Sequence, residues 1–75
     1  MNIEVGKKYL HETFAGVKVV SKITTHVEDG IYMGHLVRKK DVTELKKAGV
    51  PYTEKENLRQ CIAVVYDFQV VREWK

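Results

Sequence analysis

Cysteine and proline each occur only once in this sequence of 75 residues, and long apolar runs are missing. A single cysteine cannot form an intramolecular disulfide framework or a cysteine-based zinc site. The apolar run from Ile62 to Tyr66 is far shorter than the roughly 20 residues that a membrane helix requires. The start of the chain lacks the apolar core of a signal peptide. We therefore expect a cytoplasmic protein that does not associate with membranes.

Enzyme signatures are missing as well. The five glycines match no phosphate-binding loop. Cys61 opens an apolar run, where a thiol is more often a small buried side chain than a nucleophile. A domain of this size seldom has room for a catalytic pocket. The sequence thus predicts one domain, residues 1–75, that is not an enzyme and needs no cofactor.

A regular alternation of apolar and polar residues is present from Val17 to Val27, and it predicts a half-buried strand. Asp29 and Gly30 follow, a pair that favours a two-residue hairpin turn because both residues tolerate a positive φ. With that turn, Ile23 pairs with Leu36 on the second strand. The side chains predicted to face the core of this hairpin are Val17, Val19, Ile23, Val27, Tyr32 and Leu36.

Helix signals follow the hairpin. Asp41 is the predicted N-cap, and Glu44, three residues later, would complete a capping box. Leu45 and Ala48 supply an apolar side for packing. Gly49 suits the left-handed conformation that often follows the end of a helix. We predict a helix of about two turns from Asp41 to Ala48.

The last predicted strand runs from Cys61 to Arg72, after a polar loop over residues 51–60. Its first half is apolar on both faces, which favours a central place in the sheet. Its second half is amphipathic, so we expect it to emerge at a sheet edge. Val70 and Trp74 lie there, and we expect both near the contact with a partner protein or a second copy of the chain.

The order of a strand, a long hairpin, a short helix and a terminal strand resembles that of small SH3-like barrels, the group that includes Tudor and KOW-type modules. The resemblance covers most of the chain and rests on element order and length, so no site residue carries over from it. It implies a mainly β fold, either a small antiparallel barrel or a rolled sheet with one short helix. A helix packed on a curved antiparallel sheet, an α+β fold, is the alternative.

Two histidines, His26 and His35, fall on the hairpin face that points away from the predicted core. In the predicted register they are diagonal neighbours across the two strands. A metal site needs a third ligand, and the sequence does not place His11 near them. We therefore expect no metal site.

The charge of the chain is mildly basic, with 13 Lys and Arg against 10 Asp and Glu, a net of +3. The segment from Arg38 to Lys47 carries five bases and two acids, so it accounts for the whole excess. Such a segment attracts phosphates, and a nucleic-acid-binding module is therefore one interpretation. The residues that would form this basic patch are Lys22, Arg38, Lys39, Lys40, Lys46 and Lys47.

We favour a different function, a non-catalytic interaction module that binds a protein partner or a copy of itself. It would be an accessory or inhibitory protein of the kind that phages encode. The ordinary charge and the exposed strand edges of a small sheet favour this interpretation. Folding would bring several aromatic residues together, either in the core or on a surface that binds peptides or stacks with bases. These aromatic residues are Tyr9, Phe14, Tyr32, Tyr52 and Trp74.

Overall fold

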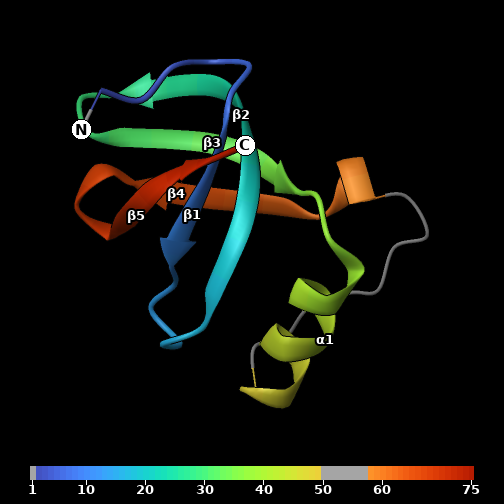
Figure 1. Cartoon of the computed structure of the whole chain (residues 1–75). Coiled ribbons are helices and arrows are strands. Elements are labelled where there is room, and N and C mark those ends of the chain that lie inside the picture. The colour runs from blue at the N-terminus through green and yellow to red at the C-terminus, as the bar shows by residue number, and fades with distance from the viewer. Residues whose placement is uncertain (1, 50–57) are drawn as a thin grey trace.

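A five-stranded antiparallel sheet and one short α-helix make up most of residues 2–49 and 58–75, which are the residues described by the computed structural model (Figure 1). The sheet order is β4-β3-β2-β1-β5. The strands are β1 (Lys8–Glu12), β2 (Lys18–Glu28), β3 (Ile31–Leu36), β4 (Ile62–Tyr66) and β5 (Val70–Trp74). The helix is α1 (Lys39–Lys47), and two short 3-10 turns are η1 (Leu58–Gln60) and η2 (Asp67–Gln69). The expectation of a mainly β antiparallel fold with one short helix is confirmed.

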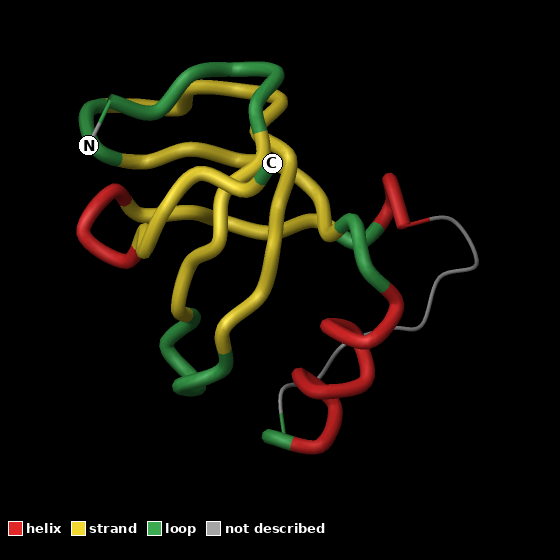
Figure 2. The backbone as a smooth tube through the Cα atoms, in the orientation of Figure 1, coloured by secondary structure: helices red, strands yellow, loops and turns green. Residues whose placement is uncertain are grey.

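The sheet is not closed into a barrel. In the described residues β4 and β5 form its two edges and do not pair with one another. Figure 2 shows η2 as a short turn that joins these two strands on the side of the sheet away from α1. Most of the loop predicted for residues 51–60, and Tyr52 within it, lie outside the described residues.

The β2–β3 hairpin turns at Asp29 and Gly30 as predicted, but of these two residues only Gly30 has a positive φ, and the register is different. Gly30 has a φ of +76°, and Glu28 pairs with Ile31 as expected. Two irregularities in β2 then shift the pairing, so that Ile23 lies opposite Gly34 rather than opposite Leu36. Bulges of this kind add a residue to one strand and bend it. A pattern with a strict period of two cannot reveal them, which is why the predicted register was wrong.

The shifted register changes which side chains of β2 are buried. Val27, predicted to face the core, is 50% exposed. Val20, on the opposite parity, is fully buried together with its neighbours Val19 and Ser21. The first half of β2 is therefore covered on both faces. One of these faces packs against the helix, since Val19 shares an apolar cluster with Val42 and Leu45 of α1.

The predicted strand from Cys61 to Arg72 is divided in two, and its predicted central position was wrong. β4 is an edge strand, and its side chains Ile62 and Val64 are 52% and 47% exposed. Apolar residues on both faces usually indicate a central strand. Here, in contrast, the outward face of β4 stays at the surface and contributes to the site described below.

Two apolar clusters lie inside the fold. The first joins α1 to the sheet, and the second lies between the start of the chain and the middle strands. Their buried members are Val19, Leu36, Val42, Leu45 and Cys61 in the first cluster, and Ile3, Tyr9, Ile23 and Val65 in the second. Burial of Cys61 agrees with the expectation of a structural thiol.

The helix begins earlier than predicted, and Asp41 does not cap it. Arg38 occupies the N-cap position and makes no side-chain capping hydrogen bond. Asp41 is buried in the first turn, where it accepts hydrogen bonds from Arg38 Nε (2.9 Å) and Nη2 (2.8 Å). It also accepts one from the backbone N–H of Val20 (2.9 Å), which ties α1 to β2. The carboxylate thus makes a tertiary contact with β2. A capping motif, which considers only neighbouring residues, cannot predict such a contact.

The C-terminal end of α1 agrees with the sequence. Gly49 has a φ of +84°, and its N–H donates to the carbonyl oxygen of Lys46 (3.0 Å). Leu45 is buried against the sheet as expected, whereas Ala48 is exposed and makes no core contact of the kind predicted. Within residues 2–49 and 58–75, no helix has the length and apolar character to cross a membrane.

Candidate functional site

Three aromatic side chains from different elements meet on the surface. They are Phe14 in the β1–β2 turn, Tyr66 at the end of β4 and Phe68 in η2, and we call them the aromatic surface. The ring centroids of Phe14 and Tyr66 are 5.3 Å apart at an edge-to-face angle of 68°. The Phe68 ring lies 5.7 Å from Tyr66 and 6.4 Å from Phe14. Such pairs attract one another, so the cluster presents a defined shape.

Exposure is the unusual property of this cluster. Phe14 is 77% exposed and Phe68 is 74% exposed, although each would gain from burial. Phe14 lies in a tight turn that Gly16 closes. Gly16 has a φ of +79° and donates its N–H to the carbonyl oxygen of Thr13 (2.9 Å). Exposed Val71 lies in a surface hollow shared with both phenylalanines. Contiguous exposed apolar groups of this kind are typical of interaction sites.

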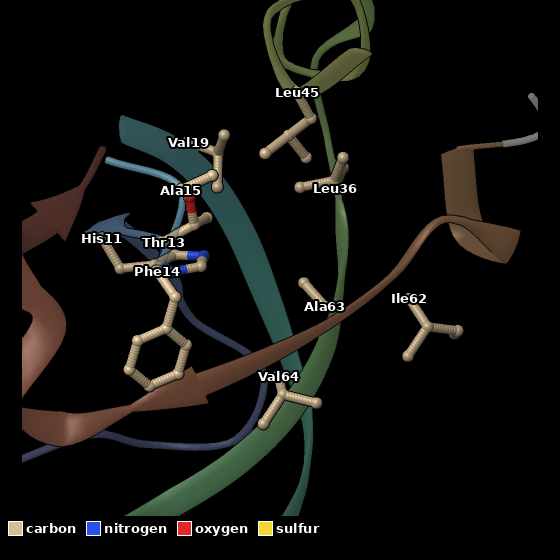
Figure 3. A pocket seen from close by; sticks show the side chains of 10 residues that line it. All are labelled: His11, Thr13, Phe14, Ala15, Val19, Leu36, Leu45, Ile62, Ala63 and Val64. Atoms are coloured by element: carbon tan, nitrogen blue, oxygen red, sulfur yellow. The ribbon is translucent and has the colours of Figure 1, made fainter. Parts of the chain in front are cut away.

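A pocket of about 230 Å³ opens beside the aromatic surface. It lies between the β1–β2 turn, the edge strand β4 and the helix, as Figure 3 shows. Phe14, Ile62 and Val64 line it at the surface, and Leu45 lines it from the helix. His11 on β1 is its one ionisable lining residue. The pocket is therefore an apolar space with few polar groups, which is the usual character of a binding pocket.

His11 is fully buried and only half of its imidazole is satisfied. Its Nε2 shares a hydrogen bond of 2.8 Å with Ser21 Oγ, whereas Nδ1 has no hydrogen-bond partner among residues 2–49 and 58–75. Burial lowers the pKa of His11 to about 4, against a smaller opposing effect of the negative charge on Asp41. The ring is therefore neutral at pH 7, and a buried polar atom without a partner carries a free-energy cost.

The pair of His11 and Ser21 has the elements of a nucleophile and its base, but not their setting. Ser21 is fully buried and, unlike His11, does not line the pocket, so an external acyl group has no approach to its Oγ. A histidine with a pKa near 4 is also a weak base at pH 7. The described residues contain no group of three or more side chains that could hold a metal ion. The described residues of this site offer apolar contact and one unpartnered hydrogen-bonding atom.

The residues of the predicted basic patch are only partly together. Lys39, Lys40, Lys46 and Lys47 are all exposed on α1. Lys47 lies 3.8 Å from Glu44 within the same helix. The patch also includes two residues with other surroundings: Arg38, which is paired with Asp41, and Lys22, which lies on β2 opposite Lys8 and His35.

The predicted apolar edge at Val70 and Trp74 is partly used within the fold. Trp74 is half-buried, and its ring lies between two guanidinium groups, Arg38 and Arg72, each 4.8 Å from the ring centroid. Cation–π contacts of this kind stabilise a side chain in place. Val70 packs against the second apolar cluster. The larger exposed apolar area lies instead around Phe14, Phe68 and β4.

The two hairpin histidines have separate surroundings. His26 stacks on Tyr32, with ring centroids 4.5 Å apart and planes at 16°. His35 lies opposite Lys22, and its Nδ1 donates to the carbonyl oxygen of Leu36 (2.9 Å). Of the remaining aromatic residues noted in the sequence, Tyr9 is buried and Tyr32 is half-buried.

Sequence reasoning missed the two features that matter here, His11 and the meeting of Phe14 with Phe68. His11 was detectable in part, because it follows buried Tyr9 by two residues and so shares its face in β1. The aromatic surface was not detectable, because Phe14 is more than 50 positions from Tyr66 and Phe68 and meets them only through the fold. No protein-family model, curated protein or solved structure matches the chain.

Proposed function

We propose that this chain is a non-catalytic interaction module that binds a protein partner through the aromatic surface of Phe14, Tyr66 and Phe68. The observation that carries the proposal is the exposure of Phe14 and Phe68, 77% and 74%, in one contiguous cluster. Aromatic side chains are enriched at protein interfaces and supply much of their binding energy. The partner is expected to present a complementary apolar segment.

The setting of the aromatic surface supports this proposal. It adjoins the outward face of the edge strand β4, on which the side chains of Ile62 and Val64 are exposed. An extended segment of a partner could lie over this face while its side chains contact the aromatic rings. We also propose that the open sheet is an SH3-like variant, a description supported by the strand order and by η2 between the edge strands.

The cellular role follows as part of the same proposal. A small domain without a catalytic group of its own acts by occupying a partner, as an accessory or inhibitory protein. Its one cysteine is a buried thiol, which suits a reducing compartment such as the cytoplasm. A phage origin would agree with a chain of this size and type.

Nucleic-acid binding is a second candidate, and one observation favours it. Four lysines of α1, Lys39, Lys40, Lys46 and Lys47, are exposed on one short helix. Binding through them would depend steeply on salt, because each phosphate contact releases counterions. Binding through the aromatic surface would change little with salt.

The test is a selection from a library of random peptides against the immobilised chain. Selected peptides should bind the wild type and lose about tenfold or more in affinity for the variant Phe14→Ser/Phe68→Ser. Val5→Ser, an exposed valine outside the aromatic surface, is the matched control and should change little. Affinity should vary by less than about threefold between low and high salt.

Three outcomes would overturn the proposal. They are the failure to select any peptide, equal binding by the Phe14→Ser/Phe68→Ser variant, or a steep loss of binding with salt that Lys46→Glu reproduces. Light scattering on the purified chain tests the alternative of self-association. A dimer weakened by Trp74→Ala and unchanged by Lys46→Glu would place the contact at the β5 edge instead.

A further inference from the structure

We propose that the pocket beside the aromatic surface receives a tyrosine side chain of the protein partner, whose hydroxyl group hydrogen-bonds to Nδ1 of His11. This inference rests on the proposed function, since it assigns a subsite to the same surface. It goes further because it names the side chain that is recognised and the atom that recognises it.

The size and lining of the pocket determine which apolar group of a ligand can enter it. Its volume of about 230 Å³ exceeds that of a cavity of about 150 Å³ that holds benzene in another protein. A six-membered ring with one small substituent therefore fits. The lining is mainly apolar, with Val19 and Leu36 on the inner side and Leu45 from the helix, so a charged group would lose its hydration there.

The polar group of the ligand is defined by His11. Figure 3 shows its ring nitrogens directed toward the space between the lining side chains. His11 lines the pocket but is fully buried, so the neighbouring side chains must part slightly before a ligand can contact it. Its Nδ1 has no partner among the residues that the structure describes. A ligand that brings one hydrogen-bonding group to this ring would satisfy that atom.

A phenolic hydroxyl matches this requirement better than other side-chain groups. The bond between His11 and Ser21 is compatible with either tautomer of the ring, so Nδ1 either donates or accepts. A hydroxyl can do both, whereas the indole N–H of tryptophan only donates. The amides of asparagine and glutamine would bring a second polar atom into an apolar space and leave it without a partner.

The position of the pocket links it to the binding surface. Phe14 belongs both to the aromatic surface and to the pocket lining, and Ile62 and Val64 line the pocket from the edge strand β4. A partner segment lying along that edge would therefore hold a side chain over the opening. The tyrosine ring would contact the edge of Phe14 as it enters, which is a favourable aromatic arrangement.

The test compares p-cresol with toluene, the side-chain analogues of tyrosine and phenylalanine, as probes of the complete ¹⁵N-labelled chain. A purely apolar cavity favours toluene, because the hydroxyl of p-cresol must leave water. We expect the opposite order here, with p-cresol binding about threefold to tenfold more tightly. p-Cresol should also shift the Nδ1 resonance of His11, and toluene should leave that resonance nearly unchanged.

Two variants control the comparison. His11→Phe/Ser21→Ala removes both partners of the internal hydrogen bond, so it should reverse the preference to toluene without leaving a polar atom unpaired. Ala63→Leu fills part of the pocket and should weaken both probes, whereas Val27→Ala, at an exposed valine outside the pocket lining, should affect neither. If the double variant does not fold, the wild type alone tests the inference: p-cresol should shift the Nδ1 resonance of His11 and toluene should not.

The peptides selected above complete the test. Replacement of their tyrosine by phenylalanine should weaken binding to the wild type by about threefold to tenfold and leave binding to the His11 variant unchanged. Equal or tighter binding of toluene, an unmoved Nδ1 resonance, or peptides without a required tyrosine would each overturn the inference. Peptides that still depend on Phe14 would leave the proposed function standing. p-Cresol binding without any peptide binding would overturn both the function and the tyrosine assignment.

Discussion

Replacement of Asp41 by alanine should destabilise the fold strongly, because its buried carboxylate links the helix to the sheet. The carboxylate accepts two hydrogen bonds from Arg38 and one from the backbone N–H of Val20, all between 2.8 and 2.9 Å. Loss of the acceptor leaves the buried N–H of Val20 unpaired, which costs about 1–3 kcal/mol. Removal of one member of a buried ion pair costs about 3–5 kcal/mol.

The cost of leaving Arg38 without its ion-pair partner is smaller than this range, because its side chain is 22% exposed and can reach water when Asp41 is lost. We therefore expect a decrease of about 3 kcal/mol in the free energy of unfolding for Asp41→Ala. Asp41→Asn keeps an oxygen that can accept from Val20, and it should lose about half as much. Stability of this order is a large part of what a small domain has.

The assay is urea unfolding followed by the fluorescence of Trp74, whose ring lies against Arg38. Glu44→Ala is the matched control, because Glu44 is on the same helix and makes only an exposed contact of 3.8 Å with Lys47. Exposed pairs contribute about 0–1 kcal/mol, so the control should change little. A loss below about 1 kcal/mol for Asp41→Ala would refute the assignment of Asp41 as the link between helix and sheet.

Three further predictions follow from single buried positions. The pKa of His11 is lowered from 6.5 to about 4, so the unfolded chain binds a proton that the folded chain does not between these values. The free energy of unfolding should therefore keep its full value above pH 6.5 and fall by about 3 kcal/mol as the pH decreases to 4. Chemical unfolding at a series of pH values should show this loss for the wild type. The His11→Phe/Ser21→Ala variant should not show it. Gly34→Ala should destabilise by at least about 2 kcal/mol in urea unfolding, because its Cβ would collide with the backbone carbonyl of Lys22; a neutral effect would contradict the close approach of β2 and β3. Cys61 is buried, so a thiol reagent should label it only on unfolding, and rapid labelling of the native protein would show that the thiol is accessible.

The sequence by itself determined the features that depend on neighbouring residues. The turn at Asp29 and Gly30 and the left-handed Gly49 after the helix are both present, because a positive φ is a local requirement that glycine meets. The mainly β character, the single helix and the burial of Leu45 and Cys61 also followed from local composition and periodicity. These signals do not depend on which strands become neighbours.

The tertiary structure decided the register, the edges and the candidate site. Irregularities in β2 moved Ile23 opposite Gly34, and a strict alternation does not contain such an extra residue. The sequence predicted Asp41 as the N-cap of the helix. Its hydrogen bonds with Arg38 and with the backbone of Val20 instead hold it buried in the first turn of α1. The basic patch and the β5 edge stay predictions, and the fold adds that Arg38 and Trp74 already contact one another.

Long-range contacts explain why the binding surface could not be predicted. β4 is as apolar as a central strand, and only the pairing of β1 with β5 left it at an edge with Ile62 and Val64 exposed. Phe14 and Phe68 meet because η2 turns the chain between the two edge strands. A sequence pattern records which side chains are apolar, but their exposure depends on which neighbours the fold supplies, and that is a property of the whole chain.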